Sequence, residues 1–258
     1  MALATLAVCG TSSCKGKAAK VIDDEANEDL KSMFRGEMDS FKIDRKTTID
    51  FFSIKHGSVA MRVANKWIYV DPVGKGAKPE TDYTVLPKAD YILITHNHGD
   101  HLDAEAISQL STESTRVIAN PAGIETLGYG ETMVNGDSIT TDEGWKIDAV
   151  PAYNNSEGKL NFHPQGRDNG YILTIGGFRV YVAGDTEVIP ELADIKDIDV
   201  AFLPCNLPFT MTPEQCAEAA KILGAKVLFP YHYSQTEIQQ VADLLEGSGT
   251  EVRIRQYQ

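Results

Sequence analysis

A segment dense in metal-binding side chains follows directly on an apolar stretch of the chain. Residues 89–95 (ADYILIT) are almost continuously apolar, as expected for a strand that is buried on both faces of a sheet. The residues that follow read HNHGDH, so histidines and an aspartate gather at the carboxyl end of that strand. This pattern requires a sheet edge at which several imidazole and carboxylate groups can meet, and it indicates a metal site.

The spacing within this segment favours shared ligation. Residues two apart in extended backbone project to the same side, so His96 and His98 can bind one metal ion. Gly99 is expected to allow a sharp turn that carries Asp100 and His101 to a neighbouring position. Imidazole and carboxylate groups suit zinc and other divalent first-row metals. A polar loop of backbone-bonded histidines is the alternative, and the density of ligands argues against it.

Composition excludes several classes of protein. The chain has 258 residues and a formal net charge of −13. It has no apolar stretch near the roughly 20 residues that a membrane-spanning helix needs. The acidic balance argues against a protein that binds nucleic acid through a basic surface. A small molecule is the expected partner, and an anionic one stays open because a bound metal can override the overall field.

Strand and helix patterns alternate from about residue 47 onward, with hairpins among them. Strands are predicted at 47–54, 58–64, 67–70, 89–95, 116–119, 138–141, 145–150, 171–175, 178–183, 199–203, 227–229 and 251–256. Helices are predicted at 103–110, 121–127, 212–224 and 236–245. This mixture predicts an α/β protein with mixed sheets. Residues 57–71 and 170–185 each read as a hairpin that ends in an aspartate, which suggests two related halves.

The N-terminal segment is predicted to lie outside this body. Residues 1–20 resemble the end of a secretory leader, because small and apolar residues precede a group of lysines. Cys9 or Cys14 would then carry the lipid of a bacterial lipoprotein, in the periplasm or tethered to the membrane, and a cytoplasmic protein with a frayed N-terminus is the alternative. Residues 21–46 are expected to form an amphipathic helix and linker. Its apolar face would comprise Leu30, Met33, Phe34, Met38 and Phe41.

Two further cysteines lie in the body of the chain. Cys205 and Cys216 flank a predicted loop and do not form a CxxC pair. A disulfide between them is compatible with export. Two packed free cysteines agree equally well with this spacing.

The HNHGDH segment matches HxHxDH, the signature of the metallo-β-lactamase fold superfamily. The resemblance extends from about Thr47 to the C-terminus. It implies a four-layer αββα sandwich of two pseudo-symmetric halves over residues 47–258. It also implies a dinuclear metal site at one edge, where loops of both halves meet.

The resemblance implies a ligand set for two divalent metal ions. The family's third histidine corresponds to His163 in FHPQGRDNGY, its metal-bridging aspartate to Asp185 in VAGDT, and its last histidine to His232 in FPYHYS. Zinc is the default metal for such ligands, while manganese and iron occur on related scaffolds. The resemblance implies that the first ion is held by His96, His98 and His163. It implies that the second ion is held by Asp100, His101 and His232, and that Asp185 binds both ions.

Four more residues are expected near this site. His56 follows a strand where a related subgroup also carries histidine, and it contacts a ligand or the substrate, or is satisfied by backbone. Asp71 resembles a family aspartate that orients a ligand, since a hydrogen bond to a histidine fixes its tautomer. Arg167 is either a contact for an anionic substrate group or a solvated loop charge. Tyr233, beside His232, is a candidate lining residue of the cleft.

The segment from His163-Pro164 to Tyr171, together with His56-Gly57-Ser58, resembles a subgroup that includes ascorbate-6-phosphate lactonase-like proteins. This implies hydrolysis of a small ester or lactone, with or without a phosphate group, by a metal-bridging hydroxide. Asp100 would orient the nucleophile or carry its proton. A phosphodiesterase, phospholipase-type or nuclease-like hydrolase of the same fold is the close alternative. A non-catalytic metal- or ligand-binding protein is the alternative from another class.

Overall fold

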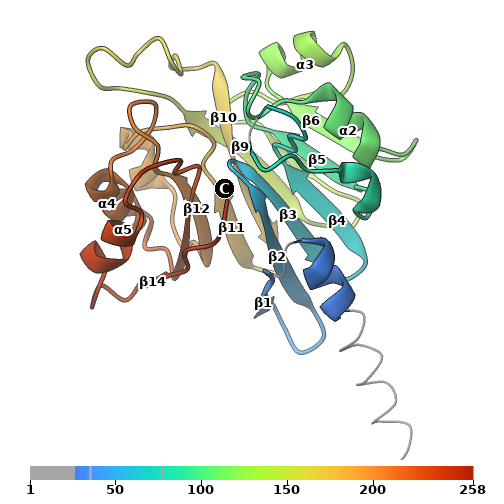
Figure 1. Cartoon of the computed structure of the whole chain (residues 1–258), viewed down its shortest axis with the longest axis horizontal. Helices are drawn as coiled ribbons and strands as arrows, with labels where there is room; N and C mark the ends of the chain where they lie inside the picture. The colour runs from blue at the N-terminus through green and yellow to red at the C-terminus, as the bar shows by residue number, and fades with distance from the viewer. Residues whose placement is uncertain (1–26, 35–36, 77, 258) are drawn as a thin grey trace, which may run out of the picture.

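Two sheets lie face to face in the computed structural model, which describes residues 27–34, 37–76 and 78–257 (Figure 1). Within these residues each sheet has seven strands, in the order β1 to β7 in one and β14 to β8 in the other. The first comprises β1 (Asp39–Lys42), β2 (Thr48–Lys55), β3 (Ser58–Val63), β4 (Lys66–Val70), β5 (Tyr91–Ile94), β6 (Arg116–Ala119) and β7 (Glu131–Thr132). The second comprises β8 (Ser138–Thr140), β9 (Lys146–Ala152), β10 (Asp168–Ile175), β11 (Phe178–Val182), β12 (Val200–Pro204), β13 (Val227–Tyr231) and β14 (Glu251–Val252).

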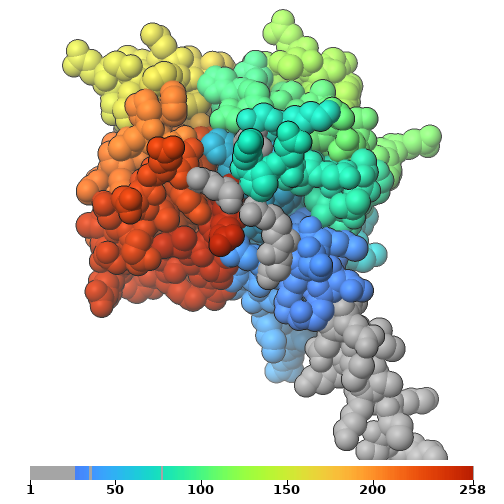
Figure 2. Space-filling model, in the orientation of Figure 1, coloured from blue at the N-terminus to red at the C-terminus, as the bar shows by residue number. Residues whose placement is uncertain are grey.

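Helices cover the outer faces of both sheets. The helices α2 (Ala104–Leu110) and α3 (Pro121–Leu127) lie beside the first sheet, and α4 (Pro213–Leu223) and α5 (Gln239–Leu244) beside the second (Figure 1). Short 3-10 helices span Tyr83–Val85 and Pro190–Asp194. These layers confirm the predicted αββα sandwich with mixed sheets. Figure 2 shows the C-terminal half, in orange and red, beside the N-terminal half, in blue and green.

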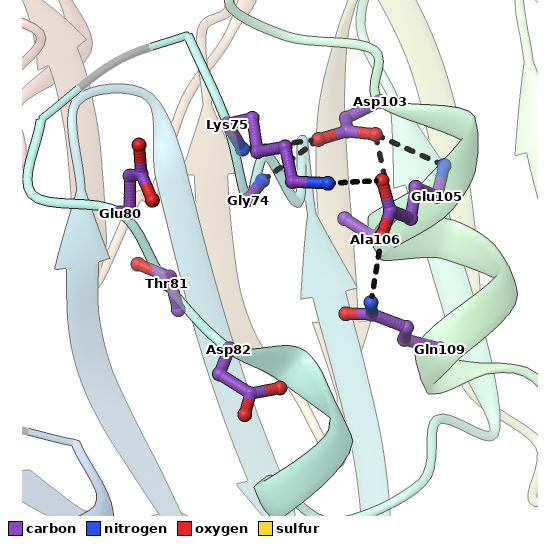
Figure 3. A pocket seen from close by; sticks show the side chains of 9 residues that line it. All are labelled: Gly74, Lys75, Glu80, Thr81, Asp82, Asp103, Glu105, Ala106 and Gln109. Carbon is purple, nitrogen blue, oxygen red and sulfur yellow. Dashed lines mark hydrogen bonds and ion pairs between the residues drawn. The ribbon is translucent and has the colours of Figure 1, made fainter.

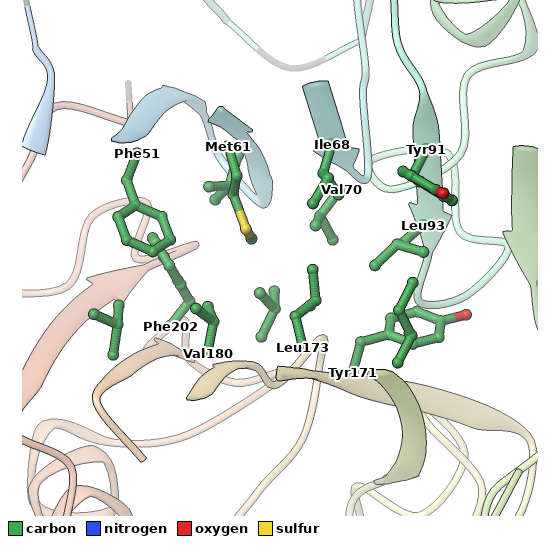
Figure 4. Close-up of a cluster of buried hydrophobic side chains, with 14 of the residues drawn as sticks. Phe51, Met61, Ile68, Val70, Tyr91, Leu93, Tyr171, Leu173, Val180 and Phe202 are labelled. Atoms are coloured by element: carbon green, nitrogen blue, oxygen red, sulfur yellow. The ribbon is translucent and has the colours of Figure 1, made fainter. Parts of the chain in front are cut away.

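The central core lies between the two sheets. Side chains of the first sheet such as Met61 and Leu93 face side chains of the second such as Leu173 and Phe202 (Figure 4). These residues are at most 1 % exposed. Burial of a side chain of this size stabilises the fold by about 1.5–3 kcal/mol. Packing of these side chains between the sheets therefore holds the two halves together.

The two sheets share one topology. In the first, β2, β3 and β4 pair antiparallel, and β4, β5 and β6 pair parallel. In the second, β9, β10 and β11 pair antiparallel, and β11, β12 and β13 pair parallel. The parallel strands of each sheet end at a common edge, which is where ligand sites of such sheets form.

Local sequence signals explain the best-defined helix. The Thr212 side chain accepts a hydrogen bond from the Gln215 amide, and the Gln215 side chain accepts one from the Thr212 amide. Pro213 occupies the first helical position, and Gly224 ends α4 in the left-handed conformation. The predicted helix at 212–224 is thereby confirmed.

The predicted N-terminal helix is wrong in its second half. Residues 27–33 are helical, and Phe34 packs its ring on Phe52 at a centroid distance of 4.3 Å. Phe41, however, lies in strand β1, and Met38 precedes that strand. The Asp44 side chain accepts hydrogen bonds from the Lys46 and Thr47 amides, which forms a turn and pairs β1 with β2. Turn chemistry thus overrides the helical spacing.

Several other predictions concern the chain ends and the cysteines. Cys205 and Cys216 are both buried and free. The predicted leader, with Cys9 and Cys14, lies outside the described residues. Within the part of the chain that is described, no helix has the length and apolar character needed to cross a membrane.

Candidate metal centre

The histidines of the chain converge on one edge of the sandwich. His56 follows β2, His96 follows β5, His163 lies between β9 and β10, and His232 follows β13. His98 and His101 lie in the loop after β5, and Asp185 follows β11. Each of these segments leaves a strand at this edge, so residues far apart in sequence come together.

The ligand atoms form three overlapping groups, each with its atoms within 4.8 Å of one another. Asp185 belongs to the group that also holds His96 and His101, so it stands between the other two. The remaining groups are His96, His98 and His163 on one side, and His56, Asp100, His101 and His232 on the other. This placement agrees with the ligand sets that the family resemblance implies, with His56 as an additional member.

Outer hydrogen bonds orient the histidine rings. Nδ1 of His101 lies 2.8 Å from the Asp71 carboxylate, and Nδ1 of His163 lies 2.6 Å from Oδ1 of Asn154. Nδ1 of His96 lies 3.0 Å from Oγ1 of Thr95. These contacts turn Nε2 of each ring toward the cluster and fix the tautomer that a metal needs.

Unpartnered atoms show that the cluster fits a metal ion. Nε2 of His101, His163 and His232 and Oδ1 of Asp185 are buried and have no hydrogen-bond partner among the described residues. A buried polar atom without a partner costs about 1–3 kcal/mol. Because these atoms face Asp185 from both of its sides, divalent cations bound on either side of Asp185 would satisfy them.

Burial and neighbouring groups set the charges of the cluster. Burial opposes the charged form of His101, but the carboxylates of Asp185 and Asp71 raise its pKa well above the ordinary value. Burial also opposes the charge on Asp185, yet the imidazoles of His232 and His101 hold its pKa well below the usual range. Burial and the neighbouring His101 lower the pKa of His96. The cluster therefore keeps its carboxylate ionised, as cation ligation requires.

The second group is organised around Asp100. Its Oδ2 lies 3.0 Å from Nε2 of His56, and its side chain is 43 % exposed. Burial opposes this charge, but the imidazoles of His232 and His56 beside the carboxylate hold the pKa of Asp100 far below its ordinary value. His56 also packs its ring on His232 at a centroid distance of 3.7 Å. Of the two roles that the sequence leaves open for His56, the structure favours contact with metal-ligand residues, here Asp100 and His232.

Strained backbone concentrates at the site. His56, Asp71 and His232 have φ angles of 45°, 46° and 49°, in the left-handed region that non-glycine residues seldom occupy. Each such residue costs about 1–3 kcal/mol and persists only where the surroundings impose it. The fold thus accepts strain at three points of the cluster.

Glycine is required beside the cluster rather than within the HNHGDH segment. A Cβ atom on Gly57 would lie 2.8 Å from Cε1 of His101. Gly99 has open space around it and no positive φ. The chain does turn sharply after His98, whose carbonyl accepts a hydrogen bond from the His101 amide, but this turn does not require glycine, because an ordinary residue could adopt the backbone conformation of Gly99.

Most of the chain is similar to known proteins. The model of the "Beta-lactamase superfamily domain" matches residues 66–233. A "UPF0173 metal-dependent hydrolase" of Anoxybacillus flavithermus is 33 % identical over 215 residues, which cover 77 % of this chain and 94 % of the relative. The chain belongs to the UPF0173 metal-dependent hydrolase family of the metallo-β-lactamase superfamily.

Other members of the UPF0173 family and solved structures agree with this assignment. The UPF0173 metal-dependent hydrolase of Thermococcus onnurineus is 33 % identical over 193 residues, covering 67 % of this chain and 79 % of that protein. A crystal structure of a candidate metal-dependent hydrolase from Parabacteroides distasonis has 50 % identity and a TM-score of 0.83. It covers 86 % of this chain and 99 % of its own. This UPF0173 chain is therefore metal-dependent by family and has His/Asp clusters to match.

A cavity of about 350 Å³ opens over the clusters of this UPF0173 protein. Asp100, Asp185 and three histidines line it, together with Phe162, Asn206 and Phe209. Nothing in the local sequence distinguished these last three residues. Thr95 and Asn154 were missed for the same reason, since their roles depend on contacts formed only in the folded chain.

Arg167 and Tyr233, which the sequence suggested as residues near the substrate, bond to other residues of this UPF0173 protein. The Arg167 guanidinium donates to both oxygens of Asp168 at 2.7 Å, and its Nη2 lies 3.4 Å from Nε2 of His98. The Tyr233 hydroxyl donates to the Arg255 carbonyl at 2.7 Å. Tyr233 does not line the cavity over the clusters. Its predicted place in the cleft is wrong because its hydroxyl anchors the C-terminal segment.

A separate cavity of about 280 Å³ lies away from the histidines, between α2 and the loop after β4 (Figure 3). Its acidic side chains include Asp103, which accepts bonds from the Gly74 amide and the first turn of α2. Glu105 pairs with Lys75 at 2.8 Å. These acids stabilise the local fold and are not part of the metal centre.

Proposed function

We propose that this UPF0173 protein hydrolyses a carboxylic ester or lactone at a centre that holds two divalent metal ions. The supporting observation is the convergence of unpartnered Nε2 atoms on Asp185. His96, His98 and His163 would hold one ion, and Asp100, His101 and His232 the other, with Asp185 between them. The imidazole and carboxylate donors favour zinc, with manganese and iron as the other candidates.

When bound, such ions lower the pKa of a water molecule and polarise the carbonyl oxygen of the substrate. Asp100 would orient the attacking water and pass its proton to the leaving oxygen. Its partial exposure at the cavity and its contact with His56 support this role. His56 would hold the Asp100 carboxylate in position. Phe162 and Phe209 would restrict the access of bulk water to the cavity.

Two features of the residues around the cavity support an ester or lactone as the substrate. The segment around His163-Pro164 resembles that of lactonase-like proteins, and two aromatic rings flank the cavity. Phosphodiester hydrolysis is the competing reaction, and the same metal chemistry would support it.

A paired activity assay tests this proposal. Metal-loaded protein is given p-nitrophenyl acetate, an aliphatic lactone and bis(p-nitrophenyl) phosphate, beside the His98→Ala variant. We expect hydrolysis of the ester or lactone that is abolished by chelation and by His98→Ala. Faster turnover of the phosphodiester, or ester turnover that persists in chelated His98→Ala, would contradict the proposal.

A further inference from the structure

A second cavity adjoins the one over the metal ligands. The two share Asn206 and Phe209 as lining residues, so they lie next to each other. The second cavity has a volume of about 540 Å³ and extends past Leu207 toward the segment 234–240. A molecule whose reacting bond lies at the metal ligands therefore has room for a further group on this side.

Apolar side chains surround the junction of the two cavities. The rings of Phe162 and Phe209 meet at a centroid distance of 5.1 Å and an interplanar angle of 68°. Phe209 is 42 % exposed and Leu207 is 48 % exposed. Large apolar side chains that are exposed together beside a cleft mark a surface that binds apolar groups.

The junction is held rigidly to the metal centre. Nδ2 of Asn154 donates to the Phe209 carbonyl at 2.8 Å, while Oδ1 of the same residue contacts His163. The Phe209 and Thr210 amides both donate to the Asn206 carbonyl. The backbone of Phe209 is therefore tied through Asn154 to a metal-ligand histidine.

The side chains that line the two cavities offer no cationic partner to an anionic group. Among the described residues that line them, there is no lysine or arginine, and the second cavity contains Glu237. Lys159 and Arg167 lie nearby but are engaged by acids. Lys159 pairs with buried Glu187 at 2.9 Å, and Arg167 with Asp168 at 2.7 Å. A phosphate or carboxylate in the second cavity, away from the metal ligands, would meet Glu237 and no cationic side chain.

We propose that the two cavities form one substrate site, selective for an uncharged ester or lactone with an apolar acyl group on Phe162, Phe209 and Leu207. This inference rests on the proposed hydrolysis and names its substrate class. The water oxygen bonds to the acyl carbon, the bond from the acyl carbon to the leaving oxygen breaks, and a water proton passes to that oxygen. An ester gives a carboxylic acid and an alcohol, and a lactone gives a single hydroxy acid.

An acyl-length series tests the apolar part of the site. The kcat/KM values for p-nitrophenyl hexanoate and acetate are compared in wild type, Phe209→Ala and the control Tyr129→Ala, which truncates an exposed aromatic ring outside both cavities. We expect wild type to prefer hexanoate by roughly tenfold. Phe209→Ala should remove this preference and Tyr129→Ala should keep it. An equal preference in all three proteins overturns the assignment of Phe209.

Two substrates that differ in charge test whether the site excludes anions. p-Nitrophenyl butanoate and mono-p-nitrophenyl succinate have the same chain length, but the second ends in a carboxylate. We expect wild type to prefer butanoate by at least roughly tenfold, and Glu237→Lys to reduce that ratio about threefold. Glu246→Lys adds the same charge outside the cavities and should leave the ratio unchanged. Equal kcat/KM values of wild type for mono-p-nitrophenyl succinate and p-nitrophenyl butanoate would overturn the proposal.

A binding measurement separates this inference from the proposed reaction. Ligand-observed NMR follows hexanamide, which is neutral and slow to hydrolyse, with metal-loaded wild type, Phe209→Ala and Tyr129→Ala. Hexanamide binding that is lost only in Phe209→Ala supports the site even if no ester is hydrolysed, and then the proposed hydrolysis alone fails. No binding to wild type, or equal binding to all three, overturns the site even if esters are hydrolysed.

Discussion

The Asp71 carboxylate lies 2.8 Å from Nδ1 of His101, and both side chains are fully buried. The same carboxylate accepts hydrogen bonds from the amide and hydroxyl of Thr95 at 2.7 Å and 2.6 Å. Thr95 in turn contacts His96. Asp71 therefore orients one metal-ligand histidine directly and a second through Thr95.

Replacing Asp71 should weaken metal binding. Asp71→Asn keeps the shape of the side chain but removes the charge that polarises His101. We expect metal affinity to fall about 10–100-fold, measured by titration with a chromophoric chelator. Asp90→Asn is the control, since Asp90 bonds Lys66 and the Trp67 amide away from the site. Equal affinity in wild type and Asp71→Asn would show that this contact does not support the centre.

Two glycine substitutions should differ sharply. Gly57→Ala places a methyl group against the His101 ring, so we expect weaker metal binding and a lower Tm. Gly99→Ala lies inside the HNHGDH segment, yet it has open space and should bind metal as wild type does. Calorimetry with and without metal measures both effects. Loss of binding in Gly99→Ala with full binding in Gly57→Ala would reverse this interpretation.

Asn154 should act through two separate bonds. Asn154→Asp keeps the acceptor for His163 but loses the donor to the Phe209 carbonyl. Asn154→Leu loses both. We therefore expect metal affinity to stay near wild type in Asn154→Asp and to fall about 10–100-fold in Asn154→Leu. Metal titration of the two variants distinguishes these outcomes, and identical losses in both would contradict a specific role for the acceptor oxygen.

Sequence patterns predicted the local part of the site and most of the strands along the chain. HNHGDH after an apolar strand was sufficient to indicate a metal centre, since four candidate ligands lie within that one segment. His163, Asp185 and His232 came only through the family resemblance, because their proximity depends on how the sheets pack. Thr95 and Asn154 gave no signal, since threonine and asparagine are common at strand ends and in loops.

The errors have physical causes as well. Met38 and Phe41 fit a helical period, but the Asp44 turn and pairing with β2 place Phe41 in a strand. A turn does form at Gly99, but the position that requires glycine is Gly57, where a Cβ atom would meet the ring of His101, 44 positions later in the sequence. Periodicity and composition describe neighbours in sequence, and these features depend on neighbours in space.

Metal binding should depend on pH in a defined direction. The carboxylates around His101 raise its pKa above the ordinary 6.5 in the metal-free protein, so a proton competes with the metal to a higher pH than usual. Apparent affinity should therefore still rise as the pH increases beyond 6.5, and fall as the pH decreases. Metal titrations across this range test the effect. An affinity that is already constant above 6.5 would contradict it.

The metal content of the folded protein tests the central claim most directly. Protein reconstituted with excess zinc and freed of unbound metal is analysed by mass spectrometry of its metals, beside His98→Ala and His232→Ala. We expect about two ions per chain in wild type and about one in each variant, because each histidine is assigned to a different ion. A well-folded wild-type protein that retains no metal would contradict the account.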